Sequence, residues 1–244
     1  MKSERHTVLV VLATLAAVVI VSARTPAAPA HDAQDKKMKE AAEQSRRAAQ
    51  AFDAIMQVPD KAIPRDLLSR AKAVAVFPRV IKVAVTVGGE GGRGVVSRHT
   101  AAGWSSPVFL RGAGGSVGPQ IGASSTDYFL LLMNDESVEG LMKDRFELGG
   151  EAALAAGPVG RNAGAATDAL MHAAILSYSR SRGLFAGVNV KGVVLKPEDD
   201  LNVAVYGRPA RELLTDRVGD GSQQGELQSF PDTLDRYTKS GVAR

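Results

Sequence analysis

One short motif has the spacing of a known catalytic site. Gly114-x-Ser116-x-Gly118 matches the nucleophile elbow of serine hydrolases. Asp127 or Asp144, followed by His172, would supply the acid and the base in the expected order. The elbow places its serine between a strand and a helix, whereas residues 119–121 begin with proline and favour a strand. We therefore expect no serine hydrolase, and no other catalytic set converges in the sequence.

A second motif, Gly89-x-Gly91-x-x-Gly94, matches the fingerprint of dinucleotide-binding folds. That fingerprint needs a following helix whose N-terminus faces the pyrophosphate, but Val95-Val96 begins a strand. We predict a hairpin at this position and no nucleotide site.

Metal ligands are sparse. The chain has no cysteine, and its four histidines lack the spacing of a metal site. Glu198-Asp199-Asp200 are consecutive, so on a helix their side chains diverge by about 100° each and cannot share a cation easily. We expect a solvated helix start there, and neither a metal nor another cofactor.

Arg180 and Arg182 are the strongest candidates for gripping an anion. An extended backbone sends side chains two residues apart to the same side, where paired guanidinium groups suit a phosphate. The alternative is structural, with the arginines tying the turn to nearby carbonyls or carboxylates. In the following strand, one face is predicted to enter a core (Leu184, Ala186, Val188, Val190, Val194). The other face (Phe185, Gly187, Asn189, Lys191) suits close approach by a polar or lipid ligand.

This stretch, Tyr178-Ser179-Arg180-Ser181 followed by Gly183-Leu184-Phe185-Ala186-Gly187, closely resembles the signature of the SYLF domain family. Other matches follow in the family's order: Ile63-Pro64, Phe77-Pro78, Val87-Gly88-Gly89, Trp104-Ser105, Gln120-Ile121-Gly122, Thr126-Asp127 and Ala155-Ala156-Gly157-Pro158. The resemblance covers roughly residues 60–207. It implies a lipid-binding module, because eukaryotic members bind phosphoinositides and some bundle actin, while bacterial members are envelope proteins.

The first 30 residues have the order of a secretory signal peptide. Lys2 and Arg5 precede an apolar run over residues 8–21, and Ala28-Pro29-Ala30 or Val21-Ser22-Ala23 offers a cleavage site. An uncleaved anchor remains the alternative. Either reading predicts an exported protein, periplasmic or associated with the envelope.

Charge is distributed unevenly along the chain. The net charge of +4 falls to +2 without residues 1–30, which hold three basic residues and one acidic residue, so nucleic acid is not an expected partner. Residues 61–111 hold nine basic residues against two acidic ones. This asymmetry would orient the protein on an anionic surface, unless folding mixes the charges on all faces.

We predict an α+β fold with a curved, mostly antiparallel, glycine-rich sheet or partly closed β-barrel, flanked by short helices. An N-terminal amphipathic helix is expected over residues 31–58, a SYLF-like lipid-binding domain over 59–207, and a polar tail over 208–244, mobile from 218. Short helices are expected at 60–72, after Asn134, whose side chain can cap the helix, and after Pro197. The apolar side of the last helix is predicted to comprise Leu201, Val203, Ala204 and Tyr206. Strands are expected at 73–77, 80–87, 95–98, 104–110, 119–123 and 127–133, joined by glycine-rich turns, and from about 172.

The sequence thus predicts a non-enzymatic protein that docks on anionic phospholipid through a basic surface, aided by the amphipathic helix. The alternative is an envelope structural or protein-interaction module. The candidate lipid-binding residues are Lys36, Lys37, Lys39, Arg46, Arg47, Phe52, Lys72, Arg79, Lys82, Arg93, Arg98, Arg111, Arg180, Arg182 and Lys191.

Overall fold

The computed structural model describes residues 28–58, 62–159, 172–181, 184–188, 190–215 and 225–239. The chain divides into two units, residues 1–33 and 34–244. Of the first unit only the start of helix α1 (Ala28–Met56) is described, so the predicted signal peptide lies almost entirely outside the described residues. None of the described helices is both long and apolar enough to cross a bilayer.

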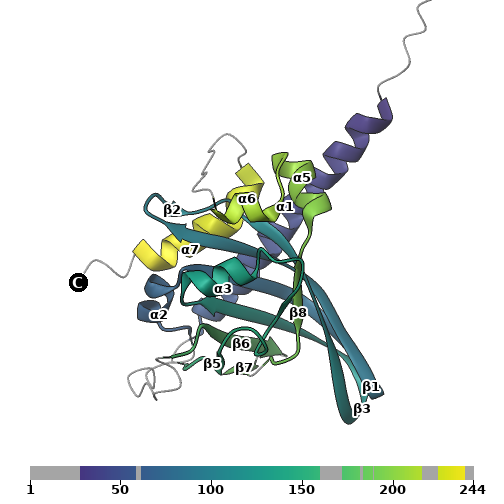
Figure 1. Ribbon diagram of the computed structural model, residues 1–244, viewed down its shortest axis with the longest axis vertical. Helices are drawn as coiled ribbons and strands as arrows, with labels where there is room; N and C mark the ends of the chain where they lie inside the picture. Colours follow the sequence, from purple (N-terminus) through teal and green to yellow (C-terminus); the bar gives the residue numbers. More distant parts are fainter. Residues whose placement is uncertain are drawn as a thin grey trace, which may run out of the picture. The chain divides into compact units, whose positions relative to one another are not determined.

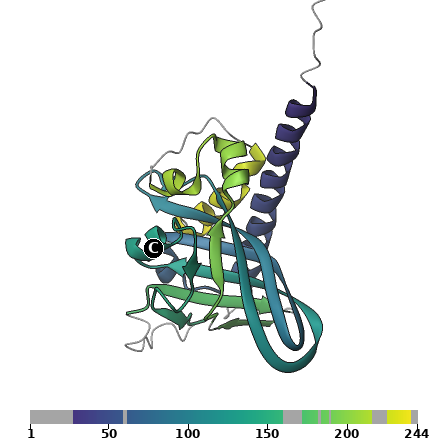
Figure 2. The same cartoon turned by 45° about the vertical axis from the view of Figure 1, so that its right-hand side comes forward.

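Two long strands form the centre of the sheet. β1 (Ala73–Thr100) and β3 (Val108–Leu132) pair antiparallel from Ala73 opposite Leu132 to Val96 opposite Val108. The short β2 (Gly103–Trp104) turns back onto the end of β1. Figure 2 shows β1 and β3 running side by side through a bend, so that the ribbon they form is folded over.

The remaining strands extend the two halves of this folded ribbon. The last part of β3 pairs with β6 (Ile175–Ser181), which is flanked by β5 (Leu154–Ala156) in parallel and β7 (Leu184–Gly187) antiparallel. The first part of β3 pairs with β8 (Val194–Pro197), and β8 pairs with β4 (Phe146–Glu147). The result is a curled, mixed sheet that forms a half-barrel (Figure 1), which confirms the predicted fold class.

The glycine-rich segments were predicted to hold tight turns, bulges and close backbone approaches; the tight turns are wrong, whereas the close approaches are confirmed. They lie within β1 and β3, where Gly89, Gly91 and Gly94 are all paired with β3. A Cβ on Gly92 would lie 2.8 Å from Val80 Cγ2, and one on Gly94 would enter the Phe77 ring. The two halves of β1 therefore pack closely against each other across the bend, and only glycine leaves room for this.

Helices pack on both faces of the sheet: α1, α2 (Arg65–Arg70), α5 (Asp199–Tyr206) and α7 (Ser229–Lys239) contribute to one core cluster, and α3 (Asp135–Gly140) and α6 (Ala210–Thr215) contribute to the other. α2 precedes β1, and α3 begins at Asn134, whose side chain accepts a hydrogen bond from the Ser137 N–H at 2.9 Å, as predicted. α5 and α6 follow β8. In α5, Leu201, Asn202 and Val205 are buried, whereas Val203, predicted on the apolar side, is 47% exposed.

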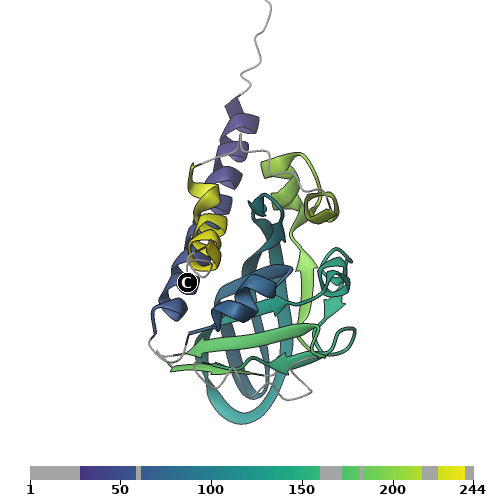
Figure 3. The same ribbon diagram turned by 90° about the vertical axis from the view of Figure 1, so that its left-hand side faces the viewer.

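Residues 225–239 are structured, which corrects the prediction of a mobile tail for this part of the chain. A short 3-10 helix (Gly225–Gln228) leads into α7 (Ser229–Lys239), which lies along α1 in Figure 3. Phe230 and Leu234 are fully buried. The Ser45 hydroxyl of α1 donates to Leu227 O at 2.6 Å and accepts from the Phe230 N–H at 3.2 Å, so α1 and α7 are joined inside the core.

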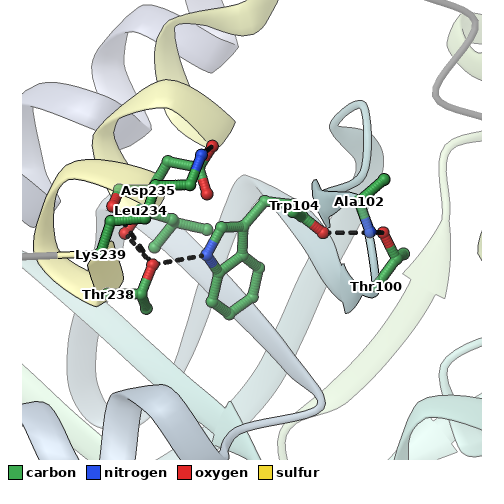
Figure 4. Close-up of polar contacts among 8 residues, drawn as sticks. Thr100, Ala102, Trp104, Leu234, Asp235, Thr238 and Lys239 are labelled. Carbon is green, nitrogen blue, oxygen red and sulfur yellow. Dashed lines mark hydrogen bonds and ion pairs between the residues drawn. The ribbon is translucent and has the colours of Figure 1, made fainter. Parts of the chain in front are cut away.

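α7 also covers the tip of the β1–β2 hairpin. Trp104 Nε1 donates to Thr238 Oγ1 at 3.3 Å (Figure 4). Gly103, with a φ of +116°, lies beside the Asp235 carboxylate. The apolar residues of α7 number too few to be recognised as a core helix in sequence, but here they complete the core beneath Trp104.

Candidate functional site

The signature arginine Arg180 holds a carboxylate of its own chain. Arg180 lies directly opposite Asp127 in the β3–β6 ladder. Its Nε and Nη2 donate to Asp127 Oδ2 at 3.0 and 2.7 Å. The structural alternative is therefore the one that the structure shows for Arg180. Arg182 lies outside the described residues.

Asp127 uses its other oxygen to fix an unusual backbone conformation. Oδ1 accepts the Arg79 N–H at 2.8 Å. Arg79 has a φ of +54°, the one positive φ at a non-glycine residue in the described part of the chain. Pro78 and Arg79 form a bulge, because the register shifts between Phe77 and Val80. Arg180 and Asp127 together thus hold Arg79 in a strained left-handed conformation, with its side chain exposed.

Arg79 borders a groove of about 320 Å³ between α1 and β1. We call it the α1–β1 groove and define it by its lining: Glu40, Glu43, Gln44 and Arg47 of α1, and Pro78, Arg79, Arg93 and Gly94 of β1. The four α1 residues recur at helical spacing, so one face of the helix forms one wall. The bulge in β1 forms part of the other wall.

Most charges in the groove are already paired. Arg47 Nε lies 2.5 Å from Glu43 Oε1, and Arg93 contacts Glu40 and, at 3.0 Å, Glu198. The Arg79 guanidinium has no ion pair among the described residues. Its charge is therefore the one in the groove lining that remains without an ionic partner.

The side-chain amide of Gln44 is buried in this groove without hydrogen bonds among the described residues. Its side chain is 9% exposed, and neither its Nε2 nor its Oε1 has a hydrogen-bond partner among the described residues. An amide buried without partners destabilises a protein by about 1–3 kcal/mol. A cluster of guanidinium groups beside an unpaired amide can bind an anion through charge-assisted hydrogen bonds.

Glu198 was predicted to be a solvated residue at a helix start, and this prediction is wrong. Its side chain is 1% exposed, and its Oε1 accepts from Arg111 Nη2 at 2.6 Å. Arg93 and Arg111 lie opposite each other in the β1–β3 ladder, so both reach the same carboxylate. The hydrogen bond from Arg111 to Glu198 is the main reason that the pKa of Arg111 is raised. These two arginines are therefore anchored internally.

Of the other predicted lipid-binding residues, some form ion pairs within the chain and others have none among the described residues. Arg46 pairs with Glu43, and Arg98 pairs with Asp135 at 2.8 Å and donates to Leu214 O at 2.6 Å. Lys191 is exposed and packs its stem near Gly149. The residues without an ion pair among the described residues are Lys36, Lys37, Lys39, Lys72, Arg79 and Lys82. Lys72 borders a second hollow of about 450 Å³, which Arg70, Arg98 and His99 also line.

Two predicted contact residues belong to the packing. Phe52 is fully buried, so it is a core residue and the prediction that it contacts lipid is wrong. A Cβ on Gly187 would collide with the backbone oxygen of Gly157. The close approach predicted at Gly187 is thus made by the chain's own backbone. Leu184, predicted to face the core, is mostly exposed.

The inside of the half-barrel leaves little space. Its cavity, lined by Phe77, Leu130 and Leu195 among others, has a volume of about 20 Å³, enough for about one water molecule. An acyl chain does not fit there in this conformation. Within the described residues no group of three or more side chains is arranged to hold a metal ion.

The serine of the elbow-like motif, Ser116, lies within β3 opposite Gly88, so the strand-to-helix turn of a hydrolase is not formed. Sequence reasoning also missed Gln44 and the role of Asp127. Pro78 in the middle of a strand-like run was the one local signal of the bulge, since proline removes a ladder donor.

A family model described as "Las17-binding protein actin regulator" (Ysc84) matches residues 113–237, from β3 through α7. The chain belongs to this Ysc84 (SYLF) family. The matched region contains Asp127 and Arg180, which hold the bulge, and it extends beyond the predicted boundary at residue 207 to include α7.

Two curated proteins are similar to this chain over most of its length. LAS seventeen-binding protein 3 of Saccharomyces cerevisiae is 34% identical over 165 residues, 65% of this chain and 36% of that protein. SH3 domain-containing YSC84-like protein 1 of Homo sapiens is 34% identical over 185 residues, 74% of this chain and 53% of that protein. The chain thus spans about a third to a half of the length of the curated relatives it matches.

Proposed function

We propose that this Ysc84-family protein is an exported, non-enzymatic module that docks on anionic phospholipid surfaces through residues 79–82. The observation that carries the proposal is Ile81, which is 50% exposed and follows the exposed Arg79 by two residues, while Lys82 comes next along β1 on the opposite face of the strand. Neither basic side chain has an ion pair among the described residues. A strand segment that carries an exposed aliphatic side chain and two cations without ion pairs suits a membrane interface, where charge attracts and apolar contact retains.

Helix α1 carries further basic side chains. Lys36, Lys37 and Lys39 of α1 are also without ion pairs among the described residues and add positive charge. α1 itself does not supply the inserted apolar surface, because its apolar face is buried against the sheet and α7. Docking in this form requires no unfolding of the helix.

Export rests on the first 30 residues, with their basic start, apolar run over 8–21 and two small-residue cleavage sites. In an exported protein the docking surface would face envelope lipids. The proposed activity is binding, and no catalytic step is proposed.

The test is co-sedimentation with vesicles of phosphatidylcholine alone and with added phosphatidylserine, at low and high salt. We expect binding only with phosphatidylserine, weakened by salt because charges are screened beyond about 10 Å at 0.1 M. Lys82→Glu removes one attraction and adds one repulsion, each about 1 kcal/mol, so binding should weaken by about 30-fold. Ile81→Ser should weaken retention at high salt in particular.

A matched control is available on α5. Val203 is 47% exposed but lies between Asn202 and Ala204, away from any basic neighbour in sequence. Val203→Ser should leave vesicle binding unchanged. Equal binding by the wild type, Ile81→Ser and Lys82→Glu would refute docking through residues 79–82.

A second candidate function is protein interaction without lipid. It is favoured by the description of the family model and by the names of relatives, which refer to Las17 binding. This candidate predicts that a folded wild type ignores both vesicle compositions at every salt concentration, so the same experiment separates the two functions.

A further inference from the structure

We propose that the α1–β1 groove is a binding site for a phosphodiester group, with the Arg79 guanidinium and the Gln44 amide as its donors. The inference rests on the proposed function in that a phospholipid headgroup carries such a group beside the docking segment. The groove itself is defined by its own residues and can be tested with soluble anions.

The charges of the groove select an anion with a single negative charge. Three arginines and two glutamates line it, and Arg47 is paired with Glu43 and Arg93 with Glu40 and Glu198. Arg79 is the lining arginine without an ion pair among the described residues, and the charges of the lining residues themselves sum to +1. A phosphodiester carries one negative charge and balances it, whereas a doubly charged phosphate monoester would also face the carboxylates of Glu40 and Glu43.

The donors that line the groove are of the type that binds phosphodiester oxygens. The guanidinium is a planar fork of donors, and the Gln44 Nε2 supplies two further N–H bonds. Both amide atoms of Gln44 are shielded from solvent and unpaired among the described residues. The terminal torsion of glutamine is soft, so the amide can turn toward a ligand that enters beside it. Binding then satisfies a buried group that is otherwise unpaired.

A binding role for Arg79 would explain why its strained backbone conformation is kept. A non-glycine residue with positive φ is retained where the surrounding structure enforces it, and such residues cluster at functional sites. Asp127 enforces the conformation through the Arg79 N–H, and Arg180 fixes Asp127 through two hydrogen bonds. The signature residues Asp127 and Arg180 are thus positioning residues, which aim Arg79 at the groove and do not touch the ligand.

The test is NMR of the folded protein during titration with dimethyl phosphate, a soluble phosphodiester, at constant ionic strength. The side-chain NH₂ signals of Gln44 are assigned by their loss in Gln44→Met. We expect these signals and the backbone amide of Gly94 to shift saturably with dimethyl phosphate, and to shift less with inorganic phosphate or acetate. Glycerophosphoglycerol, a soluble headgroup, should act like dimethyl phosphate, which separates a headgroup from free phosphate as the source.

Two variants remove the donors without disturbing the fold. Arg79→Asn keeps a residue type that accepts positive φ, so its melting temperature should not fall, while the dissociation constant for dimethyl phosphate rises by about tenfold or more. Gln44→Met replaces an unpaired buried amide by an apolar group of similar length, so it should melt no lower than the wild type and lose the Gly94 shift. Equal or higher stability together with lost binding is the expected result for both.

Several outcomes would overturn the proposal. The site is refuted if Gln44 and Gly94 do not respond to dimethyl phosphate, or if they respond equally in Arg79→Asn. A response to acetate as large as that to dimethyl phosphate would refute the phosphodiester assignment in favour of a carboxylate, such as an acidic side chain of a protein. If the groove responds as expected but vesicles do not bind the protein, the groove site stands and the proposed membrane docking fails.

Discussion

Replacing Phe52 by alanine tests whether α1 is a packing element or a membrane element. Phe52 is fully buried, and its ring contacts three aromatic rings from β3 and α7. The ring centroids lie 6.3 Å from Phe129, 6.4 Å from Phe230 and 6.0 Å from Tyr237, at tilted or edge-on angles. Such pairs stabilise a core beyond the area they bury.

The expected loss is large compared with the total stability. Truncating a buried phenylalanine to alanine costs about 3–5 kcal/mol, in proteins whose unfolding free energies are about 5–15 kcal/mol. For a domain of about 150–250 residues, each kcal/mol corresponds to roughly 2–4 °C, so the melting temperature should fall by about 6–20 °C. Circular dichroism during heating, with urea unfolding as a second measurement, gives both quantities.

Lys39→Ala on the same helix is the matched control. Lys39 is exposed and without an ion pair among the described residues, so its removal should change stability by less than about 0.5 kcal/mol. If Phe52→Ala melts like the wild type and instead loses vesicle binding, α1 leaves the core to meet lipid and the packing argument is wrong.

Three further results are expected. Gly157→Ala would place a Cβ inside the ring of Tyr178 and should destabilise the protein by about 1–3 kcal/mol or more in thermal melts, whereas Gly115→Ala, which meets nothing within 4 Å, should be far milder. Burial, with the charge and hydrogen bond of Glu90, raises the pKa of Tyr128 to about 12 from about 10, so stability should be complete below pH 10 and fall as pH rises toward 12; Tyr128→Phe should reduce that fall, and an unchanged pH dependence would contradict it. Mass spectrometry of the exported protein should find an N-terminus near residue 31, and retention of residues 1–21 in a membrane fraction would show an anchor instead.

Local features of this protein could be predicted from its sequence. The Asn134 cap, the apolar stripe of α1, the strand leading into Arg180 and the family itself follow from short-range rules, because capping, periodicity and motif order depend on neighbouring residues. The curved, glycine-rich sheet was predicted for the same reason. For Arg180 the sequence also suggested the alternative that the structure shows, a bond to a carboxylate.

Only the tertiary structure decided what those elements contact. The glycines of β1 and β3 resemble turn residues, yet they lie in a folded ribbon because Phe77 and Val80 occupy the space their side chains would need. Arg93 and Arg111 pair with Glu198 across 105 and 87 positions of the chain, and no local pattern reports such a contact. The positive φ of Arg79 and the buried amide of Gln44 likewise depend on distant partners. Charge counted along the chain could therefore predict a basic segment, but not which of its cations remain free.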